Sequence, residues 1–375
     1  MGDRLVWFGL VWLSASYNFP SLYVTPPVMT VSEQFLQELP KCEHHLHLEG
    51  TLEPDLLFPL AKRNNVTLPD TFPQTVPQLQ QKYTQFKDLQ DFLNYYYIGT
   101  NVLIQEQDFY DLAMEYFKKV SKQGLVHAEL FYDPQSHTER GISLETVTSG
   151  FNRACIDAQQ QFGISTRLIM CLLRHTTVPE CLDLVNSAKA LIQDGTIHGI
   201  GLDSAEKPFP PELFKDCYSL AKSFNPNLQL TAHAGEEGPA TYVSNALDHL
   251  NVTRIDHGIN STQDIELLKR LANDRTMLSV CPLSNVKLQV IDKVGNLPLQ
   301  QLIDHNVPFS LNSDDPAYFG GYILDNYLQV NKEFPEWDYN TWIQIAKNAV
   351  IGSWITEKRQ DEILAQIDQV AQKFI

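Results

Sequence analysis

Residues 228–236, LQLTAHAGE, and residues 307–315, VPFSLNSDD, each join a short apolar run to a polar end. From Gly124 onward, such runs alternate with longer amphipathic stretches, which is typical of repeated βα units. Strands of this kind are expected where helices or a barrel core cover both faces of a parallel sheet. The alternation therefore predicts an α/β fold with parallel strands.

The chain contains eight candidate strands. They lie in KCEHHLHLEG (41–50), GLVHAELFYD (124–133), TRLIMCLL (166–173), IHGIGLD (197–203), LQLTAHAGE, RIDHGI (254–259), MLSVCPLSN (277–285) and VPFSLNSDD. The six crossings between Val126 and Asp314 average about 31 residues, which matches the roughly 30 residues of one βαβ unit. Eight such units close a (β/α)8 TIM barrel.

The first crossing is longer than the others and predicts a helical insertion after strand one. Three helical patterns fall in it, at 53–65, 88–103 and 106–124. An insertion after a strand lies at the catalytic end of a barrel. The aromatic residues Phe92, Tyr95, Tyr96 and Tyr97 are therefore a candidate lid over the site. The alternative is that they pack as ordinary core residues. Two further helical patterns, 338–355 and 356–374, predict C-terminal helices that cover the barrel.

The domain organisation follows from length and from the N-terminal residues. With 375 residues, 43% of them hydrophobic, the chain can bury one large core, and barrels of this size are commonly one domain. We expect that domain to span residues 29–375. Residues 1–28 do not fit it: Arg4 before the apolar run 5–13 resembles a weak signal peptide, while the alternative is an extension upstream of a natural start at Met29.

Charge and cysteine content restrict partners and location. A formal net charge of -17 disfavours nucleic acid and membrane surfaces and favours a small neutral or cationic substrate. Six cysteines occur without paired spacing, which predicts buried free thiols and a reducing compartment. We expect a cytoplasmic protein, with the nucleus as a further location, although the run at 5–16 leaves secretion open. The sequence does not specify an oligomeric state.

The strongest chemical residues lie at the C-terminal ends of proposed strands, where barrel active sites form. His45 and His47 are two apart on one strand, so they face the same side and can bind one metal ion together. His233 ends the fifth strand and Asp314 the eighth. Three imidazoles and one carboxylate suit a single zinc ion that keeps a position for water.

Two groups able to move protons accompany these candidates. Glu236 follows His233 by three residues, and His257 ends the sixth strand. Each also has a purely structural explanation, since Glu236 can satisfy a helix dipole and His257 can cap a loop. Other metal-site signatures, H-E-x-x-H and P-C-x-x-C, do not occur in the sequence. The combined pattern indicates a metal-dependent hydrolase.

The motifs KCEHHLHLEG, HAGEEG, IDHGI, VCPLSN and LNSDDP occur in the order found in the adenosine and adenine deaminase family, which the chain resembles from Leu39 to the C-terminal helices. The resemblance implies a barrel, one zinc ion per chain and hydrolytic deamination of a 6-aminopurine in purine salvage. It also implies that the zinc ligands are His45, His47, His233 and Asp314.

The resemblance assigns the remaining roles as well. It makes Glu236 the proton donor to purine N1, His257 the group that orients the attacking hydroxide, and Asp315 the partner of N7. Zinc lowers the pKa of its bound water to about 7 and so supplies hydroxide at neutral pH. Protonation of N1 makes C6 electrophilic, and a partly desolvated carboxyl group can stay protonated for this task.

Two departures from the adenosine deaminase pattern favour free adenine, and hence hypoxanthine and ammonia as products. Glu49 stands where an aspartate faces the ribose, and we expect its longer side chain to intrude on the sugar pocket; Ser204 replaces a glycine near the purine. The stretch DDPAYFGGY (314–322) also resembles adenine deaminases. Deamination of adenosine or of another N6- or 9-substituted adenine is the alternative, and a catalytically inactive purine-binding barrel is a third.

Several residues have no assigned role. His44 faces away from His45, and its function is open. Glu206 and Lys207 follow strand four and either line the mouth of the site or lie in a solvated loop. The other histidines have no partner motif and are expected to be ordinary core or surface residues: His127, His137, His175, His198, His249 and His305.

Overall fold

Eight parallel strands, each paired with the next in chain order, form the centre of residues 31–375, the part of the chain described by the structure, a computed structural model. The strands are β1 (Lys41–His47), β2 (Leu125–Tyr132), β3 (Ser165–Leu173), β4 (Gly199–Asp203), β5 (Gln229–Ala234), β6 (Arg254–His257), β7 (Met277–Val280) and β8 (Phe309–Leu311). Each of the eight predicted runs contains one strand. The predicted extension, residues 1–28, lies outside the described residues.

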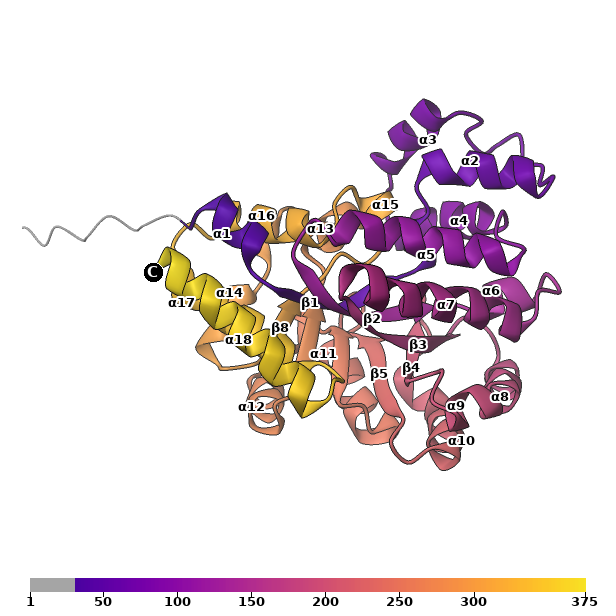
Figure 1. Cartoon of the computed structure of the whole chain (residues 1–375). Coiled ribbons are helices and arrows are strands. Elements are labelled where there is room, and N and C mark those ends of the chain that lie inside the picture. The colour runs from indigo at the N-terminus through magenta and orange to yellow at the C-terminus, as the bar shows by residue number, and fades with distance from the viewer. Residues whose placement is uncertain (1–30) are drawn as a thin grey trace, which may run out of the picture.

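Helices surround the strands (Figure 1). Their bounds are α1 (Glu33–Glu38), α2 (Pro54–Arg63), α3 (Val76–Tyr83), α4 (Leu89–Thr100), α5 (Glu106–Val120), α6 (Gln135–Thr138), α7 (Leu144–Phe162), α8 (Val178–Ser187), α9 (Lys189–Gln193), α10 (Lys215–Phe224), α11 (Ala240–Asn245), α12 (Ile265–Asp274), α13 (Pro282–Lys287), α14 (Leu299–Asp304), α15 (Pro316–Phe319), α16 (Ile323–Glu333), α17 (Tyr339–Gly352) and α18 (Glu357–Phe374).

The barrel closes just past β8, where the chain meets β1. Asp314 donates its backbone N–H to the His45 carbonyl and accepts from the His47 N–H, with both N···O distances 3.0 Å. Closure of the sheet therefore places one proposed metal ligand directly beside two others. The predicted TIM barrel is confirmed.

The insertion after β1 contains four helices rather than the three predicted. The unpredicted helix is α3, which is eight residues long, has Pro77 in its first turn and buries only Leu79 and Tyr83. A short, glutamine-rich segment with two buried residues shows little of the apolar periodicity on which helix prediction depends. In Figure 1, α2 and α3 lie at the outer edge of the molecule, whereas α5 packs beside α7 among the helices around the barrel.

The two predicted covering helices are α17 and α18, and α17 packs against β1 and β8. His44 points to this outer side of β1, as predicted from alternation. Its Nδ1 lies 2.9 Å from Ser310 Oγ and its Nε2 lies 2.8 Å from Ser353 Oγ. Burial lowers the pKa of His44 to about 3, so the ring is neutral. The unassigned histidine thus joins β1, β8 and the end of α17.

All six cysteines are buried and unpaired, as the sequence predicted. Every helix between residues 31 and 375 is too short or too polar to cross a membrane.

Candidate active site

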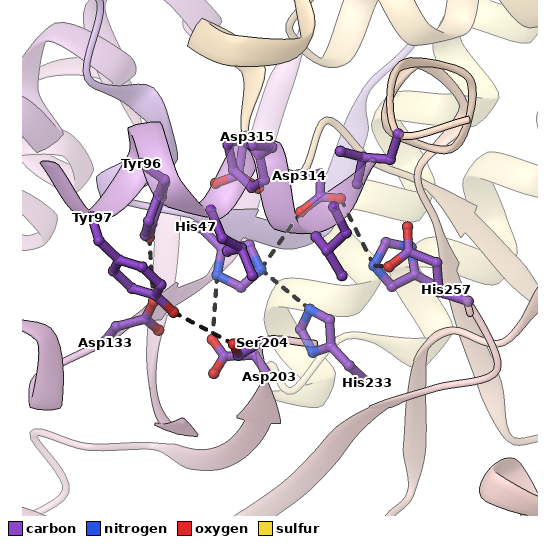
Figure 2. A pocket seen from close by; sticks show the side chains of 15 residues that line it. His47, Tyr96, Tyr97, Asp133, Asp203, Ser204, His233, His257, Asp314 and Asp315 are labelled. Carbon is purple, nitrogen blue, oxygen red and sulfur yellow. Dashed lines mark hydrogen bonds and ion pairs between the residues drawn. The ribbon is translucent and has the colours of Figure 1, made fainter. Parts of the chain in front are cut away.

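A cavity opens at the C-terminal ends of the strands. Figure 2 shows side chains from β1, β4, β5 and β6 and from the segment after β8 converging on it. The lining residues include His47, Asp133, Asp203, Ser204, His233, Glu236, His257, Asp314 and Asp315, together with Leu89, Phe92, Leu93, Tyr96, Tyr97 and Leu288.

The four predicted metal ligands meet at the base of this cavity. Nε2 of His47 lies 3.2 Å from Nε2 of His233. One carboxylate oxygen of Asp314 lies 3.3 Å from His45 Nε2 and 3.5 Å from His47 Nε2. Possible ligand atoms of His45, His47 and His233 all lie within 4.8 Å of one another. The sequence prediction that these residues converge therefore agrees with the geometry.

The other nitrogen of each imidazole faces an oxygen deeper in the barrel. His45 Nδ1 lies 3.0 Å from Ser279 Oγ, and His47 Nδ1 lies 3.6 Å from Asp203. His233 Nδ1 lies 3.6 Å from Asp256. In metal sites, such contacts on the far nitrogen orient the imidazole and leave the near nitrogen free to bind the ion.

Hydrogen-bond chemistry determines the protonation of His45. Ser279 donates its hydroxyl to Asp256, Oγ to Oδ1 3.0 Å, and Thr231 donates to the other Asp256 oxygen at 2.7 Å. Because the single Ser279 proton is used in this way, its oxygen accepts from His45 Nδ1–H. His45 Nε2 then carries only a lone pair, directed toward the base of the cavity.

This arrangement fits a metal ion. His45 Nε2 is buried without a hydrogen-bond partner in the structure, and the facing Nε2 atoms of His47 and His233 cannot both be donors. Burial lowers the pKa of His233 well below its usual value, and nearby His45 and His47 lower it further. For Asp314, burial favours the neutral form, but the neighbouring histidines outweigh it and hold the pKa well below the usual range. Imidazoles beside a carboxylate are a donor set that suits zinc.

Glu236 lies above this cluster, in the loop after β5. Its carboxyl group accepts from Asn285 Nδ2 at 3.0 Å and lies 3.4 Å from His257 Nε2. Burial, followed by the negative charges of Asp314 and Glu206, raises the Glu236 pKa well above its usual value. The raised pKa favours the protonated form of this carboxyl group, which can donate a proton.

Glu206 holds the Glu236 loop in place. Its buried carboxylate accepts the backbone N–H groups of Gly235, Glu236 and Gly238 at 2.8 to 3.1 Å. Glu206 is buried and is not among the lining residues, so it neither lines the mouth nor lies in solvent. Lys207 is exposed, as expected for a solvated loop.

His257 and Asp315 also face the cavity, because the backbone turns at the strand ends. His257 has φ 63° and Asp314 has φ 63°, both in the left-handed region. Such conformations are unfavourable for residues other than glycine and gather at functional sites. They interrupt strand alternation, so Asp256 and His257, and likewise Asp314 and Asp315, both point into the barrel end. Burial lowers the His257 pKa to about 3, so its ring is neutral.

Helix α4 forms the outer wall of the cavity. Phe92, Tyr96 and Tyr97 line it, whereas Tyr95 packs on Phe72 and Phe86 instead. Three of the four aromatic residues of the candidate lid thus cover the site. Tyr97 OH lies 3.5 Å from Ser204 Oγ, across the cavity mouth from α4 (Figure 2).

Glu49 does not enter the cavity, so the expectation that it intrudes on the sugar pocket is wrong. It is fully buried, and its Oε1 accepts from the Asp133 backbone N–H at 3.1 Å and lies 3.0 Å from His137 Nε2. A longer acid here reaches behind the cavity wall rather than into the cavity. His137 accordingly belongs to the support of the site, although the sequence offered no partner for it.

Sequence reasoning overlooked Asp133, Asp203, Asp256, Ser279 and Asn285. All five lie in motifs or at strand ends in which other residues were the predicted site residues. The available signal was their position at the catalytic end of a strand, but their partners come from other strands and are not adjacent in sequence.

Comparisons with known proteins agree with this architecture. Residues 40–370 match the family described as adenosine deaminase. Adenine deaminases of Candida glabrata and Saccharomyces cerevisiae are each 68% identical over 92% of this chain and 99% of their own. A crystal structure of adenine deaminase from Arthrobacter aurescens is 41% identical, with a TM-score of 0.85 over 89% of this chain and 99% of that chain. The chain belongs to the adenosine deaminase family, as its motifs predicted.

Proposed function

We propose that this protein is an adenine deaminase, which hydrolyses the 6-amino group of adenine to give hypoxanthine and ammonia in purine salvage. The observation that carries the reaction type is the meeting of three imidazoles, the Asp314 carboxylate and the Glu236 carboxyl group in one cavity. The 68% identical relatives that bear the name adenine deaminase support the substrate.

His45, His47, His233 and Asp314 would hold one metal ion, and zinc suits this donor set. When bound, zinc supplies hydroxide at neutral pH by lowering the pKa of water. The remaining work falls to side chains of this chain. Burial by Phe92, Tyr96 and Tyr97 keeps bulk water away and strengthens every electrostatic interaction inside.

Glu236 donates its proton to N1 of the ring, which makes C6 electrophilic. The Asn285 amide holds its carboxyl group in position for this step, and the Glu206 clamp, in which the Glu206 carboxylate accepts the backbone N–H groups of the loop, holds the loop that carries it. His257, neutral and 3.4 Å from Glu236, orients the attacking oxygen by accepting a hydrogen bond. Asp315 holds N7. Burial and the adjacent Asp314 raise the Asp315 pKa well above its usual value, so its carboxylic acid donates to the N7 lone pair.

Location and partners follow from the same features. Six buried free thiols support a reducing compartment, and we place the enzyme in the cytoplasm and, as a further location, the nucleus. Its partner is a small purine base; the net charge of -17 disfavours nucleic acid and membrane surfaces.

A substrate panel tests the proposal. Purified protein should deaminate adenine with a much higher kcat/KM than adenosine or N6-substituted adenines, followed by the change in ultraviolet absorbance. Glu236→Gln should keep its metal and lose activity by orders of magnitude. A clear preference for adenosine would refute the substrate, and undiminished turnover by Glu236→Gln would remove this residue from the mechanism.

A further inference from the structure

Five carboxyl side chains line the cavity: Asp133, Asp203, Glu236, Asp314 and Asp315. Four of them have partners in the arrangement above, since Asp314 faces the imidazoles, Asp203 faces His47 and the other two are proposed to hold the purine. Asp133 has no such role. It follows β2 and lies on the side of the cavity formed by Tyr96 and Tyr97 (Figure 2).

Asp133 presents its carboxyl oxygens at the cavity wall, next to the carboxyl group of Asp203. Its side chain is buried, and Oδ2 accepts from Tyr96 OH at 3.3 Å. Oδ1 accepts from no N–H or hydroxyl group of the described residues. Burial and the neighbouring Asp133 raise the Asp203 pKa well above its usual value, so the two carboxyl groups can share a proton. A carboxylate oxygen can accept two hydrogen bonds, and Oδ1 therefore keeps a lone pair for a donor on a molecule bound in the cavity.

The Asp133 backbone is held by a buried chain of hydrogen bonds. Arg140 Nη2 donates to His137 Nδ1 at 2.7 Å, because a guanidinium group can only donate. His137 therefore carries its proton on Nε2 and donates it to Glu49, which accepts the Asp133 backbone N–H. This chain holds the acceptor rigidly, as expected of a binding group rather than a loop residue.

We propose that Asp133 accepts the imidazole N–H of the free purine base at N9 and so determines selection of the base over 9-substituted purines. This inference rests on the proposed function. Adenine has N–H donors only on its amino group, which is the leaving group, and on its imidazole ring. With C6 at the histidine cluster and N7 at Asp315, Oδ1 of Asp133 corresponds to the imidazole edge.

A nucleoside carries carbon at N9 and has no donor there. Binding it would leave Asp133 Oδ1 without a donor from the ligand and would force the sugar toward Tyr96 and Tyr97. Sites built to bond a substrate N–H reject analogues that lack it far more strongly than apolar pockets reject an added methylene. Glu49, singled out by the sequence, then acts on specificity through Asp133 and not by blocking the sugar.

The test compares kcat/KM for adenine and 9-methyladenine. Wild type should prefer adenine by about 100-fold or more. Asp133→Ala should lower kcat/KM for adenine and reduce this preference at least tenfold. Asp133→Asn keeps a carbonyl acceptor, so its preference for adenine should lie between those of wild type and Asp133→Ala. Leu288→Ala opens another part of the wall and should lower both rates together, with the preference unchanged.

Binding of the product gives a readout independent of turnover. Calorimetry should show Asp133→Ala losing affinity for hypoxanthine but not for 9-methylhypoxanthine. If steric exclusion alone operates, Asp133→Ala will gain 9-methyladenine activity without losing adenine activity, which would overturn the inference. A second metal ion per chain, held by His47, Asp133 and Asp203 and lost in Asp133→Ala, would also overturn it, because the ion would use the free oxygen.

The outcomes separate the two proposals. A wild-type protein without adenine deaminase activity refutes the proposed function. A wild-type protein that deaminates adenine, with Asp133→Ala lowering both substrates equally, refutes only the role of Asp133.

Discussion

Ser279 Oγ lies 3.0 Å from His45 Nδ1, and this contact determines which nitrogen of the imidazole faces the cavity. The hydroxyl proton of Ser279 goes to Asp256, which also faces His233 Nδ1 at 3.6 Å. One buried carboxylate on β6 therefore orients two proposed metal ligands on two other strands.

Loss of this contact should weaken metal binding. Ser279→Ala removes the acceptor for His45 Nδ1–H, and we expect zinc affinity to fall by roughly 10- to 100-fold. Competition with a chromophoric chelator measures it directly. Ser310→Ala is the matched control, because Ser310 Oγ lies 2.9 Å from Nδ1 of His44, which faces away from the site. Equal effects of the two variants would contradict the assignment.

The Glu206 clamp should matter for catalysis. The Glu206 carboxylate accepts three backbone N–H groups with its two oxygens. In Glu206→Gln only one of these atoms remains an oxygen, and the amide NH₂ group would face a backbone N–H donor, with which it cannot form a hydrogen bond. Displacement of the Glu236 loop should lower kcat/KM for adenine about 100-fold, with metal content retained. Glu212→Gln removes a carboxylate that bonds Asn245 outside the cavity and should leave kcat/KM within a factor of two or so. A full-rate Glu206→Gln enzyme would show that the clamp is dispensable.

The pH profile should have an alkaline limb set by Glu236. Its pKa is raised by burial and then by Asp314, Glu206 and Glu237, and only the protonated form can donate to N1. Activity is therefore present below the raised pKa and lost as pH rises through it. Glu237→Gln removes one of the charges that raise this pKa, so the limb in a kcat/KM profile should move to lower pH. Movement to higher pH would exclude Glu236 as the titrating acid.

Gly50 should tolerate no side chain. A Cβ at this position would overlap Asp315 Oδ1 and lie 2.8 Å from the Asp315 Cα, so the backbone that carries Asp315 would have to move. A displacement near 1 Å costs about 100-fold in rate, which steady-state kinetics of Gly50→Ala would measure. In Gly295→Ala the new Cβ meets only the flexible end of Glu333, and activity there should be unchanged. Normal turnover by Gly50→Ala would mean that Asp315 needs no accurate placement.

Much of the fold was predictable from local pattern. Apolar runs at a spacing of about 31 residues identify parallel strands and their crossings, because a strand that is buried on both faces is apolar along most of its length. Helix α3 escaped this reasoning because it buries only Leu79 and Tyr83. The proposed metal ligands were found because each ends a strand, and strand ends share one face of a barrel.

Short motifs in the sequence identify the residues proposed to carry the chemistry: the His45 and His47 pair, His233, Glu236 and the Asp314–Asp315 pair. How these residues are held depends on contacts that form only in the folded chain. Ser279 reaches Asp256 across 23 residues of sequence, and Glu49 turns away from the cavity to bond Asp133 across 84. A buried polar group takes its role from whichever donor or acceptor packing brings beside it, and that neighbour is not encoded in the local pattern.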